Sequence, residues 1–341
     1  MQANGATQPQ DFGERADDGM EAACCARLAA AIARRLPEAG EYATAVPGLT
    51  FFRCDAGTPP ASVLYEPSLS LVVQGRKRVV LGARDYEYGT GQFLVTSVDL
   101  PTVAHVPDAD PAHPFLSILL RLDLKVVQEI GAEIALQGLQ PGDTGMGSII
   151  GRGTVDLLET VLRLARLSEK PRDIPIVGGL AVREIIYHLL MGPAGGRLRE
   201  IAMLGTRCNR IAHVVAWLRE HYAQPFGVEA LAEMATMGVS TFHHHFNAMT
   251  GMSPLQYRKR IRLHEARRLL LTEPVDASTA ALRVGYESVT QFNQEYRQLF
   301  GNPPIRDISS LRAGPGAPED AVPILPRQPR RRGPDRVRSS D

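Results

Sequence analysis

The sequence predicts an α+β protein of two domains: a small β-barrel or sandwich with flanking helices, followed by an all-α domain. Three observations support this prediction. Short β-rich segments alternate with Gly, Pro and Asp between residues 47 and 123, helical periodicity begins after Asp123, and residues 228–304 contain an internal repeat. A chain of 341 residues is also long enough for two domains of ordinary size.

The composition favours a globular protein of the cytoplasm. Apolar residues make up 44% of the chain and charged residues 22%. No run approaches the ~18 apolar residues of a membrane span, and acidic residues precede the first apolar stretch, unlike in a secretory signal. Residues 1–205 carry a net charge of −5 and residues 206–312 a net charge of +4, so we expect the back half alone to meet a polyanion.

The front of the chain divides by periodicity. We expect residues 1–40 to hold a disordered start and a short Ala-rich helix, and residues 41–200 to form the first domain. Within that domain the β-rich runs at 47–123 form the barrel, and three amphipathic stretches at 124–200 form helices. The run Gln74-Gly75-Arg76-Lys77-Arg78 is typical of a hairpin turn with solvated charges, and a ligand-anion or interdomain contact is the alternative.

The repeat inside residues 228–304 consists of two copies of a helix, a tight turn and a second helix. Phe242, Phe246 and Gly251 recur 50 positions later as Phe292, Tyr296 and Gly301, whereas Ala232 recurs 49 positions later as Ala281. The extra residue of the second copy therefore falls in its turn. We expect Gly238 and Gly285 to supply the backbone freedom that each turn needs.

The two copies are helix-turn-helix units joined by one long helix. We place the first unit at 228–250, the connecting helix at 254–272 and the second unit at 275–300, inside a domain at 206–305. Ser253, Pro254 and Gln256 are the start signals of the connecting helix. A rod of this length can hold two reading helices about one DNA repeat, ~34 Å, apart. Residues 313–341 are expected to form a disordered basic tail.

The chain resembles the AraC/XylS family of transcription regulators. The resemblance rests on the motifs ALAEMA, VSTFHHHF, TG-x-SP-x-Q-Y, RIRLHEARRLLL, VGYES and EYRQLFG-x-PP. The segments VLYEPSLSLVVQGRKRVVLG and YEYGTGQFLVTSVDLP resemble the N-terminal domain of one subgroup of that family. This resemblance implies a cupin-like β-barrel that senses a small molecule, and a sequence-specific DNA-binding domain.

The family reads DNA with the exposed faces of the second helix of each unit. By position, this implies DNA contacts for the residues of two sets. The first unit contributes Ser240, Thr241, His243, His244 and Asn247, and the second contributes Thr290, Gln291, Asn293 and Gln294. The family often has arginine where this chain has His244 and Gln294, and neutral His or Gln implies different base preferences.

Basic residues near the two units are expected to attract the phosphates. They are Arg258, Lys259, Arg262, Arg268 and Arg297, with support from Arg260 and Arg267.

The front domain offers residues for a small effector. Tyr65, Tyr86, Tyr88 and Phe93 could line its cavity, although aromatic residues at strand spacing are also typical of plain core. Four cysteines without a Cys-x-x-Cys motif indicate reduced thiols, and a sensing role for Cys54 is the alternative.

A metal enzyme of the cupin type with a helical appendage is the alternative function. The barrel segment has only His105 and His113 for such a site, and successive helix positions prevent His243, His244 and His245 from facing one ion. We therefore predict no enzyme activity, no catalytic or metal-binding residues and no cofactor. The expected partners are double-stranded DNA, a small effector, RNA polymerase and a second copy of the chain.

Overall fold

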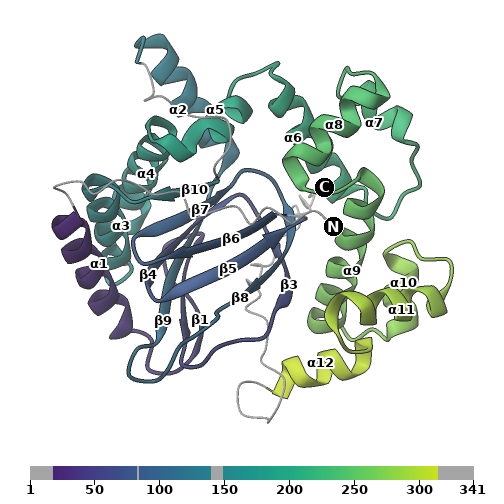
Figure 1. Ribbon diagram of the computed structural model, residues 1–341, viewed down its shortest axis with the longest axis horizontal. Helices are drawn as coiled ribbons and strands as arrows, with labels where there is room; N and C mark the ends of the chain where they lie inside the picture. The colour runs from purple at the N-terminus through teal and green to yellow at the C-terminus, as the bar shows by residue number, and fades with distance from the viewer. Residues whose placement is uncertain (1–17, 83, 140–148, 314–341) are drawn as a thin grey trace, which may run out of the picture.

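The computed structural model describes residues 18–82, 84–139 and 149–313. The first domain begins with helix α1, Asp18–Ala33, and continues into ten strands arranged in two antiparallel sheets. The six-stranded sheet has the order β1-β2-β9-β4-β7-β10, and the four-stranded sheet has the order β3-β8-β5-β6. The two sheets, with helices beside them and an all-helical second domain, confirm the α+β prediction (Figure 1).

The strands are short and extend further along the chain than expected. Their bounds are β1 Gly40–Ala43, β2 Leu49–Cys54, β3 Ala61–Tyr65, β4 Ser68–Gln74, β5 Arg76–Leu81, β6 Arg84–Gly89, β7 Gln92–Thr96, β8 Leu100–His105, β9 Phe115–Arg121 and β10 Ile150–Arg152. The first and last strands lie outside the expected span of 47–123. They were missed because each is four residues or fewer, and β10 gains its hydrogen bonds only by pairing with β7.

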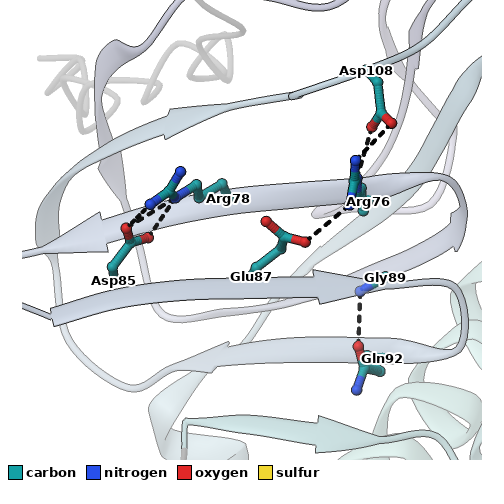
Figure 2. Close-up of polar contacts among 7 residues, drawn as sticks. All are labelled: Arg76, Arg78, Asp85, Glu87, Gly89, Gln92 and Asp108. Atoms are coloured by element: carbon teal, nitrogen blue, oxygen red, sulfur yellow. Dashed lines mark hydrogen bonds and ion pairs between the residues drawn. The ribbon is translucent and has the colours of Figure 1, made fainter. Parts of the chain in front are cut away.

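Strands β4 and β5 do not form the hairpin that the sequence predicts at Gln74–Arg78, because β4 lies in the six-stranded sheet and β5 in the four-stranded sheet. Gly75 has a φ of +83°, in the left-handed region that glycine adopts without strain. Arg76 binds both carboxylate oxygens of Asp108 at 2.9 Å and approaches Glu87, while Arg78 pairs with Asp85 (Figure 2). These charges are exposed, as expected for the outer face of a sheet.

The six-stranded sheet is covered by helices. Helix α2 spans Leu124–Leu136, α3 Val155–Leu167, α4 Gly179–Met191 and α5 Gly196–Ala202, with a π-helical turn at Ile174–Gly178 and a 3-10 turn at Pro193–Gly195. Figure 1 shows α1, α3 and α4 on one side of the sheets. Their apolar faces join strand residues such as Phe51 and Leu69 in one core. Because α3 has a polar outer face and an apolar inner one, burial against α1 and α4 fixes its orientation.

One stretch, Ile174–Met191, has the length and apolar composition of a membrane span, which is weak evidence by itself. The stretch lies partly inside the domain core through Ile185, Ile186 and Leu189. Its Arg183 pairs with Glu129 and Glu133 on α2. These contacts are those of a core helix of a folded domain.

The second domain comprises seven helices among the described residues. They are α6 Arg207–Glu220, α7 Val228–Met234, α8 Val239–Thr250, α9 Pro254–Thr272, α10 Ala277–Arg283, α11 Val289–Phe300 and α12 Pro304–Ala313. Helix α12 extends the domain beyond residue 305, where the sequence predicts its end. It packs on α9 and α11, and its Asp307 forms a buried ion pair with Arg267.

Only one of the two turns uses the glycine that the sequence predicts. Gly285 has a φ of +86°, as predicted, but Gly238 has a φ of −67° and forms the N-cap of α8. The left-handed residue of the first turn is Thr236, with a φ of +54°. Thr236 and Gly285 are 49 positions apart, so the extra residue of the second copy lies between the left-handed residue and the helix cap.

The two domains touch along α9. The outer face of β3 and β8 packs against this helix. Tyr257, fully buried on α9, donates its hydroxyl hydrogen to the carbonyl oxygen of Asp99 at 3.0 Å. Arg219 on α6 lies between Asp99 and Glu265, at 3.9 and 3.1 Å. The helical domain is therefore seated on the four-stranded sheet by polar contacts with buried partners.

Candidate nucleic-acid interface

Helix α8 presents a polar face to solvent. Phe242 and Phe246 are fully buried and lie with ring centroids 5.4 Å apart, so they fix the inner face of the helix. Of the five residues predicted to read DNA, Ser240, Thr241, His244 and Asn247 are exposed and His243 is half-buried. His245 is half-buried, and burial lowers its pKa, which favours the neutral ring.

Helix α11 repeats this arrangement. Phe292 and Tyr296 are fully buried, with ring centroids 5.5 Å apart. All four predicted reading residues, Thr290, Gln291, Asn293 and Gln294, are exposed. Ser288 caps the helix by accepting a hydrogen bond from the backbone N–H of Gln291 at 3.3 Å. The side-chain amide of Gln291 also donates to Glu295 at 3.3 Å, which holds it along the helix.

Helix α9 sets the separation of the two reading helices. It has 19 residues, about 28 Å at 1.5 Å per residue. Its start has the capping box and the proline that the sequence predicts at Ser253, Pro254 and Gln256. Helices α8 and α11 both pack on α9, and Figure 1 shows them toward opposite ends of it.

The predicted phosphate contacts fall into two groups, and the first remains close to solvent. Arg297 is exposed and forms no ion pair with a described residue. Arg258 stacks over the ring of Phe226 at 4.5 Å, and Lys259 pairs with Glu295 at 3.2 Å. Both are half-buried along their stems, so their charged ends are positioned by the domain itself.

The arginines of the second group bind other groups of the protein itself. Arg262 donates to the carbonyl oxygens of Tyr222 and Ala223, at 2.7 and 3.1 Å, and Arg268 pairs with Glu265 at 2.6 Å. The prediction for Arg267 is wrong, because its side chain is buried and bound to both carboxylate oxygens of Asp307. Burial also lowers the pKa of Arg260.

The predicted effector residues do not all share one face. Tyr65 and Tyr88 are buried together in the core between the sheets, with Tyr86 partly buried beside them. Phe93 instead belongs to the core between the six-stranded sheet and the helices, so its assignment to the same cavity is wrong. Lys77, expected to be solvated, turns inward, and its Nζ lies 5.3 Å from the centroid of the Tyr65 ring.

The cysteines and histidines form no reactive or metal-binding cluster within the described ranges. Burial raises the pKa of the Cys54 thiol to about 11, which leaves little thiolate for sensing at neutral pH. No group of three or more His, Cys, Asp or Glu side chains in the described part of the chain is arranged to hold a metal ion.

Sequence reasoning missed two arginines that lie near the end of α8 but belong to other elements of the fold. Arg197, on α5, donates to the carbonyl oxygen of Ala248 at 3.2 Å. Together with Arg84, from the start of β6, it lines a crevice that also includes Asn247. No local pattern could have revealed this grouping, because the three residues come from segments more than 45 positions apart in the chain.

Two family models match the chain. The model described as AraC-type transcriptional regulator N-terminus matches residues 45–197, and the model described as Helix-turn-helix domain matches residues 231–307. Curated relatives include the HTH-type transcriptional activator RhaS of Salmonella schwarzengrund (strain CVM19633). It is 30% identical over 155 residues, which cover 45% of this chain and 54% of the relative. The chain thus spans about half the length of the curated relatives it matches.

Solved structures also match the chain. ToxT from Vibrio cholerae O395, bound to (E)-4-(8-methylnaphthalen-1-yl)but-3-enoic acid, covers 76% of this chain and 97% of its own, with a TM-score of 0.52 and 9% identity. The DNA-binding domain of AdpA, solved in complex with a target DNA, is 36% identical and covers 30% of this chain and 94% of its own, with a TM-score of 0.29. Both family models and the fold lead to one assignment. The chain belongs to the AraC/XylS family of transcription regulators.

Proposed function

We propose that this protein is a sequence-specific DNA-binding transcription regulator that inserts α8 and α11 into successive major grooves. The observation that carries the proposal is the pair of exposed polar faces, one on each helix, each opposite two buried aromatic residues. Major grooves one helical turn apart lie ~34 Å apart, which α9 and its flanking helices can span. The side chains proposed to read bases are Ser240, Thr241, His243, His244, Asn247, Thr290, Gln291, Asn293 and Gln294.

The reading faces are almost free of charge. Helix α8 has no Lys or Arg, and α11 has only Arg297. Since phosphate contacts give most of the salt-dependent affinity, we expect a modest salt dependence. Selectivity would come from Asn and Gln, whose amides recognise adenine, and from histidine.

The experiment is selection of bound sequences from random duplexes with the full chain, followed by anisotropy titrations. Gln294→Ala should change the preference at particular base pairs, each by about 1 to 3 kcal/mol. Gln137→Ala, an exposed glutamine of the first domain, is the matched control and should change nothing. A chain that binds no duplex even in dilute salt would refute the proposal.

We further propose that the first domain binds a small effector between its sheets. The support is a set of polar side-chain groups inside an apolar core. The buried hydroxyl of Tyr65 lies beside that of Tyr88, the hydroxyl of Tyr88 lies 3.1 Å from Ser70 Oγ, and Lys77 faces inward. The ToxT structure of the same fold is bound to a small organic acid. A thermal-shift screen of metabolites with wild type and Tyr65→Phe tests this site, because a ligand of the native state raises apparent stability.

A second copy of the chain and RNA polymerase are the other proposed partners. Ile176, in the π-helical turn, and Leu180, four residues later at the start of α4, are 73% and 63% exposed, and exposed apolar residues grouped in this way favour self-association. Sedimentation of wild type and Leu180→Glu tests it, since a dimer through this face should dissociate in the variant. Nothing within the described ranges favours the enzyme alternative.

A further inference from the structure

A crevice separates the first domain from the end of α8. Its volume is about 90 Å³, and it is lined by Leu81, Arg84, Arg197, Asn247, Ala248 and Gly251. These residues belong to three parts of the fold: the hairpin of β5 and β6, helix α5, and the reading helix α8 with its cap. On this measure of volume about 10 to 15 Å³ is enough for one water, so the crevice has room for a group of several heavy atoms.

The lining of the crevice is positively charged. Arg84 is exposed and pairs with no carboxylate among the described residues, because its neighbour Asp85 is bound to Arg78. Arg197 is half-buried and gives one hydrogen bond to the carbonyl oxygen of Ala248, which leaves further N–H donors of its guanidinium. Among the residues that the structure describes, no acidic side chain is part of the lining.

The backbones of two glycines meet beside the arginines. Gly82, with a φ of +61°, contacts Gly251, with a φ of +73°, so closely that a Cβ on Gly82 would lie 2.1 Å from the carbonyl oxygen of Gly251. Two glycines therefore let the hairpin backbone touch the C-terminal cap of α8. A group held in the crevice would contact both domains at this seam.

We propose that the crevice binds a free oxyanion, a phosphate or a carboxylate, between Arg84 and Arg197. Guanidinium groups bind planar or tetrahedral oxyanions through two parallel hydrogen bonds, and the Asn247 amide supplies a further donor. A bound oxyanion removes the repulsion of two unpaired cations and ties the hairpin to α8. A duplex backbone, with sugars on both sides of each phosphate, fits a half-buried site of this volume less well than a free anion does.

The consequence for regulation depends on the proposed DNA-binding function. Asn247 belongs to the face of α8 proposed to read DNA, and an oxyanion that engages it competes with that role. Occupancy also favours the pose in which α8 rests on the hairpin, and a ligand shifts an equilibrium only through such a difference in affinity. We therefore expect the bound oxyanion to lower the affinity for DNA.

The first test needs no DNA, so its failure is distinct from a failure of the proposed function. Inorganic phosphate, and separately benzoate, are titrated into the full chain at constant ionic strength set with sodium chloride, and thermal unfolding is followed. The wild type should show a saturable rise in its unfolding midpoint with at least one probe. Arg84→Gln and Arg197→Gln should each weaken that response at least tenfold, whereas Arg172→Gln, an exposed arginine outside the crevice, should keep it.

Arg84→Gln keeps the test decisive if Arg197→Gln unfolds, because Arg84 makes no ion pair within the described ranges. No saturable response to either probe overturns the proposal, as does an equal response in the wild type and both crevice variants. If both variants lose DNA affinity while the wild type ignores phosphate and benzoate, the crevice holds a DNA phosphate and the proposal of a free oxyanion is wrong.

Discussion

The hydroxyl oxygen of Ser62, on β3, lies 3.1 Å from Nε2 of His264, on α9, and both side chains are buried. This contact joins a strand of the first domain to the helix that connects the two helix-turn-helix units. Burial, with help from the positive charges of Arg267, Arg219 and Arg260, lowers the pKa of His264 to about 3. The ring is therefore neutral at neutral pH and its contact with Ser62 is one between uncharged groups.

His264 should make the protein sensitive to acid. Its pKa is about 6.5 in the unfolded chain and about 3 in the folded one, so the unfolded state takes up the proton first. Its contribution to stability is complete above pH 6.5 and is lost as the pH falls through this window, by up to about 1.4 kcal/mol per pH unit. Urea unfolding at pH 7 and pH 5 should show a smaller loss in His264→Gln than in the wild type. An equally small loss in His113→Gln, whose side chain is 85% exposed, would refute the assignment.

Asp99 should affect the pH dependence of stability in the opposite direction to His264. Burial raises the pKa of its carboxyl from 3.8 to about 6, although Arg219 opposes the rise. The folded state then holds the proton more tightly, so the cost of ionising Asp99 appears as the pH rises from about 4 to 6 and is complete above that. Asp99→Asn should therefore stabilise the fold at pH 7.5, by up to about 3 kcal/mol, and leave it unchanged near pH 3.5.

A pH-independent gain in Asp99→Asn would show that the raised pKa is not its cause. Asp85→Asn is the contrasting variant, because a hydrogen bond from Arg78 lowers the pKa of Asp85 and its removal should not stabilise the protein at pH 7.5.

The ion pair of Arg267 and Asp307 should make α12 part of the stable core of the second domain. The two side chains are 2.6 Å apart and nearly fully buried, and the Tyr296 hydroxyl donates to the same carboxylate at 2.7 Å. Removing one partner leaves a buried charge alone, so Asp307→Ala should lower the free energy of unfolding by about 3 to 5 kcal/mol. Arg306→Ala, exposed on the same helix, should cost less than about 0.5 kcal/mol. Similar losses in the two variants would contradict this role.

Arg262 and Arg297 should separate stability from DNA contact. The guanidinium of Arg262 donates to two backbone carbonyl oxygens that follow α6. Arg262→Ala should therefore lower the unfolding midpoint, and it should weaken binding to all DNA duplexes because the domain partly unfolds. Arg297 is exposed, so Arg297→Ala should leave the midpoint unchanged and reduce the slope of log affinity against log salt by about one. The opposite assignment of the two effects would show that Arg262 reaches the phosphates.

Thr236 offers a gain in stability. Its φ of +54° places a β-branched residue in the left-handed region, at a cost of about 1 to 2 kcal/mol. Asparagine tolerates this region, so Thr236→Asn should raise the free energy of unfolding by about 0.5 to 1 kcal/mol. Gly285→Ala in the second copy should destabilise instead, because its Cβ would lie 2.5 Å from the carbonyl oxygen of Ala223. A loss of stability in Thr236→Asn would mean that the threonine side chain is needed in the turn.

The sequence by itself determined the helical repeat. The spacing of Phe242 and Phe246, and of Phe292 and Tyr296, fixes which face of each helix is buried, because helical periodicity is a local property. The start of α9 and the left-handed turn at Gly285 were predictable for the same reason. The alternation in the strand segments likewise indicated a small antiparallel domain.

Only the tertiary structure decided the partners of the charged and aromatic side chains. Strand β10 forms because it pairs with β7. Helix α12 is held by the ion pair of Asp307 with Arg267, which lies 40 positions earlier in the chain. The direction of Phe93, the inward turn of Lys77 and the crevice of Arg84 and Arg197 depend on which segments meet. Contacts between distant segments leave no periodic trace in the sequence, because they are set by packing rather than by local geometry.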